Sequence, residues 1–389
     1  MKLIEQIALD ARVQAALNNF RTRQSESIGL IKAIQQIPAP TFAEARRAAF
    51  VESRMTALGL SDVAQDDLHN VYGRFPGQNR RAPLVISAHL DTVFPLETDL
   101  TIRENGRFLY GPGIGDNSTG VAGLLLLAQA LIGQRLPLAR DVWFVANVGE
   151  EGLGDLRGMR AVVERFGRAA SYIVVEGGLF GQISHQAIGV HRYRLNVSGP
   201  GGHSWGSFGA ASAIHVLGHL IVAIDKLPVP DPPRTTYNVG VIEGGTSINT
   251  IAQSASLLLD LRSEEPVALQ QLEDSVTQIV RQSNQQWREA GIQVTMTPIG
   301  NRPAGKISRN TGLVKTAVAA LQFVGQHTIT FMMGSTDANV PLSQGITAVC
   351  IGLTESGNAH RLDEFIDPTH LPDGLSQLLL LTLAAAGFS

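Results

Sequence analysis

Two apolar runs in this chain end abruptly in ionisable side chains, and this pattern constrains the fold more than any other feature. Leu84-Val85-Ile86-Ser87-Ala88 is followed by His89-Leu90-Asp91, and Val142-Trp143-Phe144-Val145-Ala146 is followed closely by Glu150-Glu151. Short apolar runs are typical of strands buried on both faces of a parallel sheet. The carboxyl ends of such strands meet at one edge of the sheet, where α/β proteins bind ligands. The pattern therefore predicts a ligand site at the ends of these strands.

The strands and helices expected around these runs indicate an α/β fold. Apolar periodicity predicts helices over 3–36, 42–58 and 120–133, the first two separated by Pro38-Ala39-Pro40. Strands are expected at the positions 83–88, 141–147, 172–176 and 346–352. This alternation favours a mostly parallel sheet that helices cover.

A different order of elements is expected in the middle of the chain. The expected elements are a strand at 192–197, a helix at 210–226, strands at 235–242 and 254–262, a helix at 267–290 and a strand at 292–296. This βαββαβ order matches a ferredoxin-like α+β domain. With 389 residues the chain is long enough for two domains. We therefore expect a first domain formed by residues 1–186 and 300–389, with an inserted domain at 187–299.

Composition excludes several classes of function. The formal net charge is −3 and the basic residues are scattered, which argues against a nucleic-acid partner or a membrane-binding patch. The longest apolar stretches are about half the length that spans a bilayer, and no signal-type segment begins the chain, so we expect a cytoplasmic protein. The single cysteine, Cys350, excludes an intramolecular disulfide and a thiolate-rich metal site, and its apolar neighbours predict a buried side chain.

Six residues, three of them at the ends of these apolar runs, are candidates for a hydrolytic metal site. Each lies at a predicted strand end or in a tight loop, and the set is His89, Asp116, Glu150, Glu151, Glu176 and His360. Imidazoles and carboxylates are the ligands of zinc-type ions, and a neighbouring carboxylate can serve as the base. Each residue alone has an ordinary explanation as a helix cap, a turn residue or a solvated loop residue. The pair Glu150 and Glu151 would repel each other unless a cation or a shared proton were present.

Asp91 is expected to act on the metal site indirectly. It follows His89 by two residues, so on an extended strand both side chains point the same way. A carboxylate beside a metal-binding histidine commonly orients the imidazole.

The ordered set of motifs resembles metallopeptidase family twenty, which includes aminoacylases, glutamate carboxypeptidase, peptidase T-like enzymes and the succinyl-diaminopimelate desuccinylase. The resemblance rests on His89-x-Asp91, Gly115-Asp116-Asn117, Glu150-Glu151, Glu176 and His360, and it covers essentially the whole chain. It implies two divalent metal ions per chain, zinc first, with Mn²⁺ or Co²⁺ as alternatives.

The resemblance also implies a role for each residue of the site. Asp116 and a water would bridge the two ions, His89 and Glu176 would hold one ion, and Glu151 with His360 would hold the other. Glu150 would be the general base that takes a proton from the bridging water. The family further suggests a cis peptide bond after Asp116.

The inserted domain has motifs similar to those of the family's lid and dimerisation domain. In Gly202-His203-Ser204-Trp205, His203 matches a lid histidine that stabilises the oxyanion in the partner subunit's active site, which implies a homodimer. Asn249 matches a lid asparagine that contacts substrate. Arg262 is similar to an arginine that can grip a substrate carboxylate, although a surface arginine at a strand end explains it equally well. The loop Met333–Asn339 resembles a substrate-side loop, in which Asp337 has no assigned role.

The expected reaction is hydrolysis of an amide bond in a small peptide or an N-acyl amino acid. Glu176, where other members have Asp, favours carboxypeptidase- or aminoacylase-like substrates over those of aminopeptidases. Asn117-Ser118-Thr119 departs from relatives that have a lysine soon after the bridging aspartate.

Two alternative functions remain open. Gly202–Gly206 fits G-x-S-x-G, so Ser204 could be the nucleophile of a serine hydrolase with Asp337 and His360. The residues around it lack the strand and helix that such a nucleophile needs on either side. The second alternative is a relative that binds ligands without catalysis.

Overall fold

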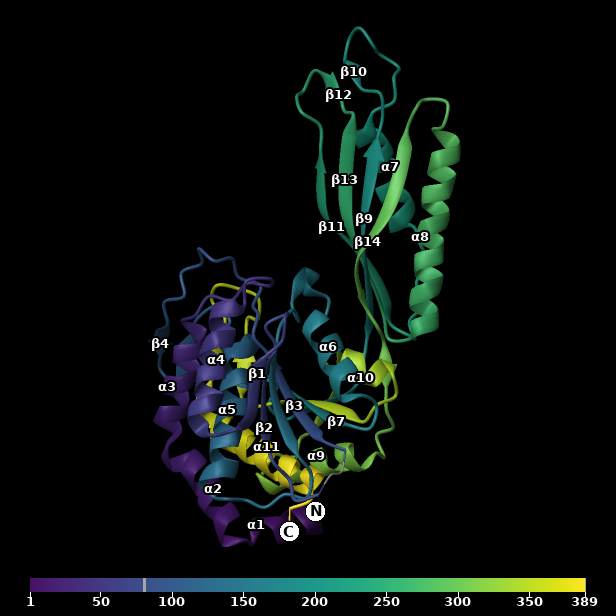
Figure 1. Ribbon diagram of the computed structural model, residues 1–389. Helices are drawn as coiled ribbons and strands as arrows, with labels where there is room; N and C mark the ends of the chain where they lie inside the picture. Colours follow the sequence, from purple (N-terminus) through teal and green to yellow (C-terminus); the bar gives the residue numbers. More distant parts are fainter. Residues whose placement is uncertain (80–81, 389) are drawn as a thin grey trace. The chain divides into compact units, whose positions relative to one another are not determined.

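A computed structural model of the chain describes residues 1–79 and 82–388, and the chain forms two compact units (Figure 1). Unit 1 consists of Met1–Ala187 and Lys306–Ser389, and unit 2 consists of Ile188–Gly305. The borders of unit 2 lie close to the expected residues 187 and 299. In the part of the chain that the structure describes, no helix is both long and apolar enough to cross a membrane.

The centre of unit 1 is a mixed sheet whose middle strands are parallel. Its strands, in order across the sheet, are β1 (Ser61–Gln65), β2 (Val71–Phe75), β6 (Val142–Asn147), β3 (Leu84–His89), β7 (Ser171–Glu176), β17 (Ala348–Gly352), β8 (Gln182–Ala187) and β15 (Gly305–Lys306), and β16 (Thr330–Gly334) also pairs with β8. Strand β3 runs parallel to both β6 and β7, and β7 runs parallel to β17. Antiparallel pairing occurs between β1 and β2, between β2 and β6, and between β17 and β8. The mostly parallel sheet expected from the sequence is therefore present.

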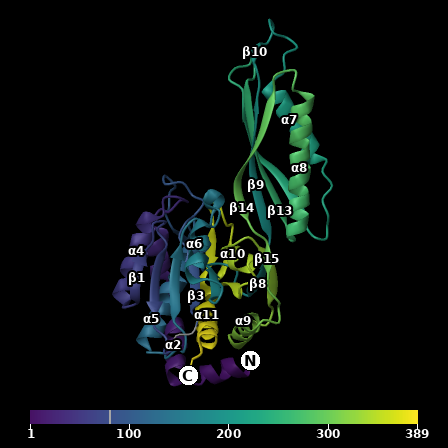
Figure 2. The same ribbon diagram turned by 45° about the vertical axis from the view of Figure 1, so that its right-hand side comes forward.

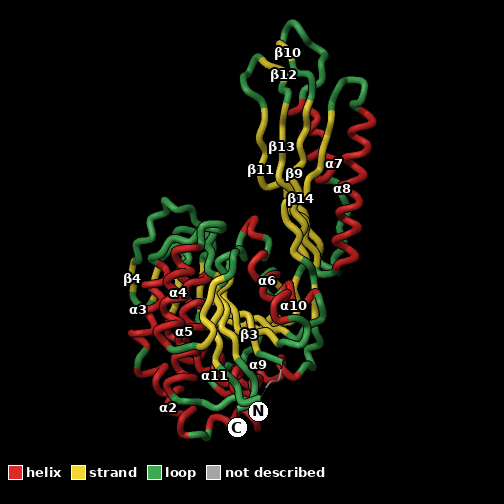
Figure 3. Tube along the Cα trace, viewed as in Figure 1, coloured by secondary structure: helices red, strands yellow, loops and turns green. Residues whose placement is uncertain are grey.

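Helices cover both faces of this sheet, as Figure 3 shows by colour. The helices of unit 1 are α1 (Lys2–Ala8), α2 (Ala11–Thr22), α3 (Gln24–Gln35), α4 (Ala45–Leu58), α5 (Gly120–Gly133), α6 (Arg157–Phe166), α9 (Gly312–Phe323), α10 (Asn339–Ser343) and α11 (Leu371–Ala386). Alternate residues of the buried strands face opposite sides, as the pleat of a strand requires. Ile86 and Phe144 belong to the core beneath α5 and α11, whereas Val85 and Val145 belong to the core beneath α6 and α10.

The range 3–36 is helical, as its periodicity predicts, but the structure divides it into three helices. The chain leaves helical geometry at Asp10, whose side chain accepts a hydrogen bond from the Arg12 backbone N–H and caps α2. A second break lies at Arg23, between α2 and α3. The expected helix from residue 42 begins at Ala45, whereas α5 has the bounds expected from its apolar periodicity.

A second, small sheet in unit 1 was not expected from the sequence. It consists of β18 (Glu355–Gly357), β19 (Phe365–Asp367), β5 (Phe108–Tyr110) and β4 (Arg103–Asn105), in that order. Pairing of Tyr110 with Phe365 brings the loop after β5 close to the loop between β18 and β19. Asp116 lies in the short π-helical turn η1 (Ile114–Thr119) after the first loop, and His360 lies in the second. This sheet therefore brings two distant candidate residues to one place.

Unit 2 contains a four-stranded antiparallel sheet and two helices (Figure 2). Its main elements follow the order β9 (Gly189–Ser198), α7 (Ala213–Asp225), β11 (Thr235–Gly244), β13 (Ser254–Ser263), α8 (Pro266–Gln286) and β14 (Gln293–Arg302), and the strand order across the sheet is β11-β13-β9-β14. Leu257, Leu259 and Leu261 of β13 are buried on the same face, as expected. The two-residue strands β10 (Gly202–His203) and β12 (Thr250–Ile251) pair with each other at one end of this unit.

Candidate metal centre

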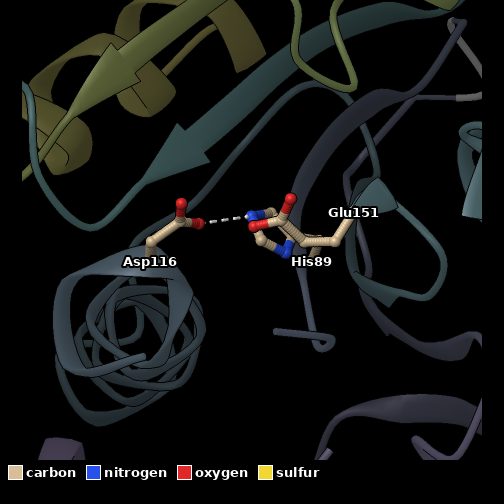
Figure 4. Close-up of side chains that lie close together, drawn as sticks. All are labelled: His89, Asp116 and Glu151. Carbon is tan, nitrogen blue, oxygen red and sulfur yellow. Dashed lines mark ion pairs between the residues drawn. The ribbon is translucent and has the colours of Figure 1, made fainter. Parts of the chain in front are cut away.

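The carboxylate of Asp116 lies between two histidines that are 271 residues apart in the chain, and Figure 4 shows it with His89 and Glu151. Its Oδ1 is 3.1 Å from Nε2 of His89, and its Oδ2 is 3.1 Å from Nε2 of His360. The same nitrogen of His360 is 3.1 Å from Oε1 of Glu151, and that of His89 is 3.6 Å from Oε2 of Glu176. The five residues expected to bind metal therefore meet at one site.

The parallel strands explain why these side chains converge. His89 and Glu176 are the last residues of β3 and β7, and Glu151 lies four residues beyond the end of β6. Because β6, β3 and β7 are adjacent and parallel, their carboxyl ends lie at the same edge of the sheet. His89, Glu151 and Glu176 are almost completely buried there, whereas about half of the His360 side chain is exposed. The site is therefore open to solvent on the side of His360.

Asp91 holds the two neighbouring strand ends together. Its completely buried carboxylate accepts hydrogen bonds from the backbone N–H of Glu150 at 3.0 Å and of Glu151 at 2.9 Å. The hydroxyl of Thr41 donates to the same carboxylate at 2.9 Å. Nδ1 of His89 lies 3.0 Å from the Asp91 carbonyl oxygen and 3.6 Å from its carboxylate. Asp91 thus fixes the turn that presents both glutamates, in addition to its contact with the imidazole.

Glu364 holds the loop that presents Asp116. Its buried carboxylate accepts three backbone hydrogen bonds, from Gly113 at 3.0 Å and from Gly115 and Asp116 at 2.8 Å each. The Asp116–Asn117 peptide bond is cis, as the resemblance implied. The amide of Asn117 donates to the carbonyl of Val175 and accepts from the Gly177 N–H, which ties this loop to the end of β7.

Sequence reasoning missed Thr41, Glu364 and Arg47, which support the site without facing it. The guanidinium of Arg47 is fully buried and donates to the carbonyl oxygens of Ile37 and Leu90, so it joins α4 to the end of β3. Burial lowers the pKa of Arg47 to about 10. A charged residue inside an otherwise apolar helix face was the available signal for Arg47. Nothing local in the sequence distinguishes Glu364, whose partners lie about 250 residues away.

The carboxylates shift the pKa of both histidines upward. Hydrogen bonds to Asp116 and Glu151 raise the pKa of His360 to about 10. Burial lowers the pKa of His89, but hydrogen bonds to Asp116, Asp91 and Glu176 outweigh it and hold the pKa well above its usual value. Burial likewise raises the pKa of Asp116, but its hydrogen bonds to both histidines hold that pKa well below the usual range. The site therefore attracts positive charge.

The donor set fits divalent cations. The ligand atoms of His89, Asp116 and Glu151 all lie within 4.8 Å of one another, so one ion could contact all three. Imidazole nitrogens and carboxylate oxygens suit Zn²⁺, Mn²⁺ and Co²⁺, and metal binding replaces the protons that the carboxylates otherwise hold on the imidazoles. Since each oxygen of Asp116 faces a different histidine, this carboxylate is placed to contact two ions.

In unit 2 the structure brings two of the three candidate residues together. His203 pairs with Thr250 across β10 and β12, and the N–H of Ser204 donates to the carbonyl of Asn249 at 3.0 Å. Arg262 lies near the other end of β13, eight residues beyond Ser254, and its Nε donates to Asp260 at 2.6 Å.

The model of peptidase family M20/M25/M40 matches residues 85–384, which include the metal centre and all of unit 2. The chain belongs to this family. The resemblance inferred from the motifs is therefore confirmed, and membership supports metal-dependent hydrolysis by a peptidase or amidohydrolase.

Relatives of this chain align with it over most of their own length. The chain is 24% identical to the succinyl-diaminopimelate desuccinylase of Corynebacterium glutamicum, covering 87% of this chain and 91% of the relative. It is 26% identical to the acetylornithine deacetylase of Myxococcus xanthus, covering 85% and 87%. A crystal structure of a tripeptidase from Staphylococcus aureus has the same fold, with a TM-score of 0.77, 22% identity and coverage of 92% and 98%.

The structure of this chain argues against the alternative of a serine hydrolase. Ser204 follows the two-residue strand β10, and the next helix, α7, begins only at Ala213. The proposed partners of Ser204 have other contacts. His360 faces Asp116 and Glu151, and the fully buried Asp337 accepts a hydrogen bond from Asn147 at 2.7 Å. Burial raises the pKa of Asp337 to about 7.

We expect Glu364→Ala to lower the metal content of the protein, because three backbone N–H groups of the Asp116 loop lose their acceptor in the interior. Glu364→Gln should retain most of the metal, since the amide oxygen can still accept hydrogen bonds. Elemental analysis of both variants, with Glu355→Ala on exposed β18 as the control, measures the effect. Unchanged metal content in Glu364→Ala would show that this carboxylate does not hold the loop.

Proposed function

We propose that this chain hydrolyses an amide bond in a small peptide or an N-acyl amino acid, using two divalent metal ions. The observation that carries the proposal is the carboxylate of Asp116, each oxygen of which lies 3.1 Å from a different histidine. Zinc is the ion we expect first, and Mn²⁺ or Co²⁺ would suit the same donors. His89, Asp116 and Glu176 would hold one ion, and Asp116, Glu151 and His360 would hold the other.

The divalent ions, when bound, would polarise the scissile carbonyl and lower the pKa of the attacking water. Glu150 would accept the proton of that water and deliver it to the leaving amine nitrogen. Its backbone is fixed by Asp91, and its side chain is almost completely buried beside Glu151. This geometry supports a base whose position does not depend on a flexible loop.

We propose that unit 2 is a ferredoxin-like lid, and that His203 in it donates a hydrogen bond to the developing oxyanion. The βαββαβ order and the antiparallel sheet support the first part. Nδ1 of His203 lies 3.2 Å from the backbone nitrogen of Trp205 and 3.3 Å from that of Gly206, and it accepts both N–H groups. The neutral ring then carries its proton on Nε2, the nitrogen left free to donate to substrate.

The length of β13 supports a homodimer. Arg262 and the segment that carries His203 and Asn249 lie at opposite ends of this strand, roughly 25 Å apart at about 3.3 Å per residue. One small substrate cannot reach both ends of the same unit. If Arg262 binds a substrate carboxylate and His203 with Asn249 contacts the substrate, two different subunits must supply them. We therefore propose that His203 and Asn249 act in the partner subunit's site.

The carboxylate that Arg262 would bind is that of a carboxypeptidase- or aminoacylase-type substrate. Arg262 shares Asp260 with Arg192, whose Nε lies 2.9 Å from the other oxygen of that carboxylate. A substrate carboxylate would compete with Asp260 for the guanidinium of Arg262, whose side chain is about two-fifths exposed.

Glu150→Gln should lower kcat by at least a hundredfold while metal content stays unchanged, because the amide cannot accept the proton of the attacking water. Steady-state kinetics on an N-acyl amino acid, paired with elemental analysis, provides the measurement. Glu164→Gln on the exposed side of α6 is the matched control and should behave like the unaltered protein. A Glu150→Gln variant with normal turnover would remove this residue from the role of base.

His203→Ala should lower kcat by roughly a hundredfold, the effect typical of losing one oxyanion donor. His215→Ala, an exposed histidine of α7 in the same unit, serves as the control. Mixing His203→Ala with Glu150→Gln subunits tests action across the dimer. Recovery of activity in the mixture is expected, because one site of each mixed dimer then combines an intact base with an intact histidine. Normal kcat in His203→Ala alone would contradict the oxyanion role.

A further inference from the structure

Phe42 is an exposed aromatic residue that the proposed reaction does not use, and its neighbour in the chain, Thr41, contacts residues of the metal site. Its side chain is 64% exposed, and its φ of 75° is uncommon for a bulky residue. The preceding residue, Thr41, donates its hydroxyl to Asp91 and lies 3.4 Å from the carbonyl oxygen of Glu151. The residue before Phe42 therefore contacts both Asp91, which positions the proposed base, and the backbone of Glu151, a candidate ligand.

Contacts on both sides fix the position of Phe42. The N–H of Ala43 donates to the carbonyl of Pro40 at 2.8 Å, which closes a turn around Thr41 and Phe42. The N–H of Thr92 donates to the carbonyl of Ala39, which joins the turn to the end of β3. The backbone of Phe42 is in the left-handed region, and its exposed phenyl ring contributes little to the stability of the fold. This arrangement points to a role in binding.

Arg157 supports one face of the Phe42 ring. Its guanidinium carbon lies 4.6 Å from the ring centroid, and its Nη2 forms a 2.8 Å ion pair with the buried Glu44. The Arg157 side chain also covers Gly149, where an added Cβ would lie 2.4 Å from Nη1. Gly149 directly precedes Glu150. Arg157 thus connects the ring to the turn that carries the base.

Exposed leucines follow three of the candidate ligands closely in the chain. Leu153 lies two residues after Glu151 in the turn η2 (Gly152–Gly154), Leu179 lies three residues after Glu176, and Leu362 lies two residues after His360. A single exposed leucine is ordinary on a protein surface. Here three exposed leucines each follow a candidate ligand by two or three residues, and Phe42 follows Thr41, which contacts Asp91 and Glu151.

We propose that Phe42 and Leu153, an exposed leucine two residues after Glu151, form a subsite for a bulky apolar side chain of the substrate. This inference rests on the proposed hydrolysis of peptides or N-acyl amino acids and specifies their class. The preferred substrates carry an aromatic or branched aliphatic side chain next to the scissile amide.

The test compares N-acetyl derivatives of glycine, alanine, leucine and phenylalanine as substrates of the zinc-loaded protein. Phe42→Ala should lower kcat/KM for the leucine and phenylalanine derivatives by about tenfold or more, the usual effect of a lost apolar contact. The kcat/KM for the glycine and alanine derivatives should change by less than about twofold. Phe42→Leu should retain most of the preference. Phe323→Ala, a partly exposed phenylalanine of α9, is the matched control.

Calorimetric binding of free phenylalanine and glycine to the same variants separates this inference from the proposed function. Tighter binding of phenylalanine than of glycine, lost in Phe42→Ala and kept in Phe323→Ala, supports the subsite even if none of the substrates is hydrolysed. The missing hydrolysis would then count only against the proposed reaction. An equal loss of kcat/KM on all four substrates, or no change in selectivity and binding, overturns the subsite while leaving the proposed hydrolysis intact.

Discussion

The carboxylate of Asp116 is shared by two histidines, and the rest of the site is arranged around this interaction. Three carboxylates, those of Asp116, Glu151 and Glu176, lie within 3.6 Å of the two imidazoles. Acidic groups at such distances repel one another unless positive charge lies between them. In the protein alone, protonated histidines supply that charge, as the raised pKa of His360 indicates. Divalent cations would supply more of it with the same donors, which is why this cluster favours metal binding.

Hydrogen bonds from buried carboxylates to backbone N–H groups hold the segments that carry this charged cluster. Asp91 accepts the N–H groups of Glu150 and Glu151, and Glu364 accepts three N–H groups from the loop of Asp116. Both carboxylates are buried, and each accepts hydrogen bonds from backbone that lies far from it in the sequence. Charged hydrogen bonds of this kind are stronger than neutral ones and fix direction as well as distance. The geometry of the candidate site is thus set in part by residues that are not among the expected metal ligands.

The sequence predicted those parts of the structure whose cause is local. Buried strands such as β3 and β6 are short apolar runs, α5 is a continuous apolar helix, and the candidate ligands stand at strand ends or in glycine-rich loops. Parallel pairing of β3 with β6 and β7 then brings His89, Glu151 and Glu176 to one edge of the sheet without further information. The break of the first expected helix at Asp10 was missed because its capping hydrogen bond outweighs the apolar periodicity around it.

What the sequence could not predict depends on contacts between distant segments. The small sheet that joins Tyr110 to Phe365 consists of strands of three residues, too short for a periodic pattern. Glu364 looks like an ordinary loop residue until that pairing places it beside Gly113. The position of Phe42 near the site likewise depends on a distant contact, because Thr41 before it donates a hydrogen bond to Asp91.

The most direct test of the account is the metal content of the gently purified protein, measured by elemental analysis together with hydrolysis of N-acyl amino acids and dipeptides with and without a chelator. The account predicts close to two ions per chain, loss of hydrolysis in the chelator, and its recovery on adding Zn²⁺, Mn²⁺ or Co²⁺. Metal-free protein that still cleaves its substrate and is blocked by a serine-directed reagent would contradict the account and favour Ser204.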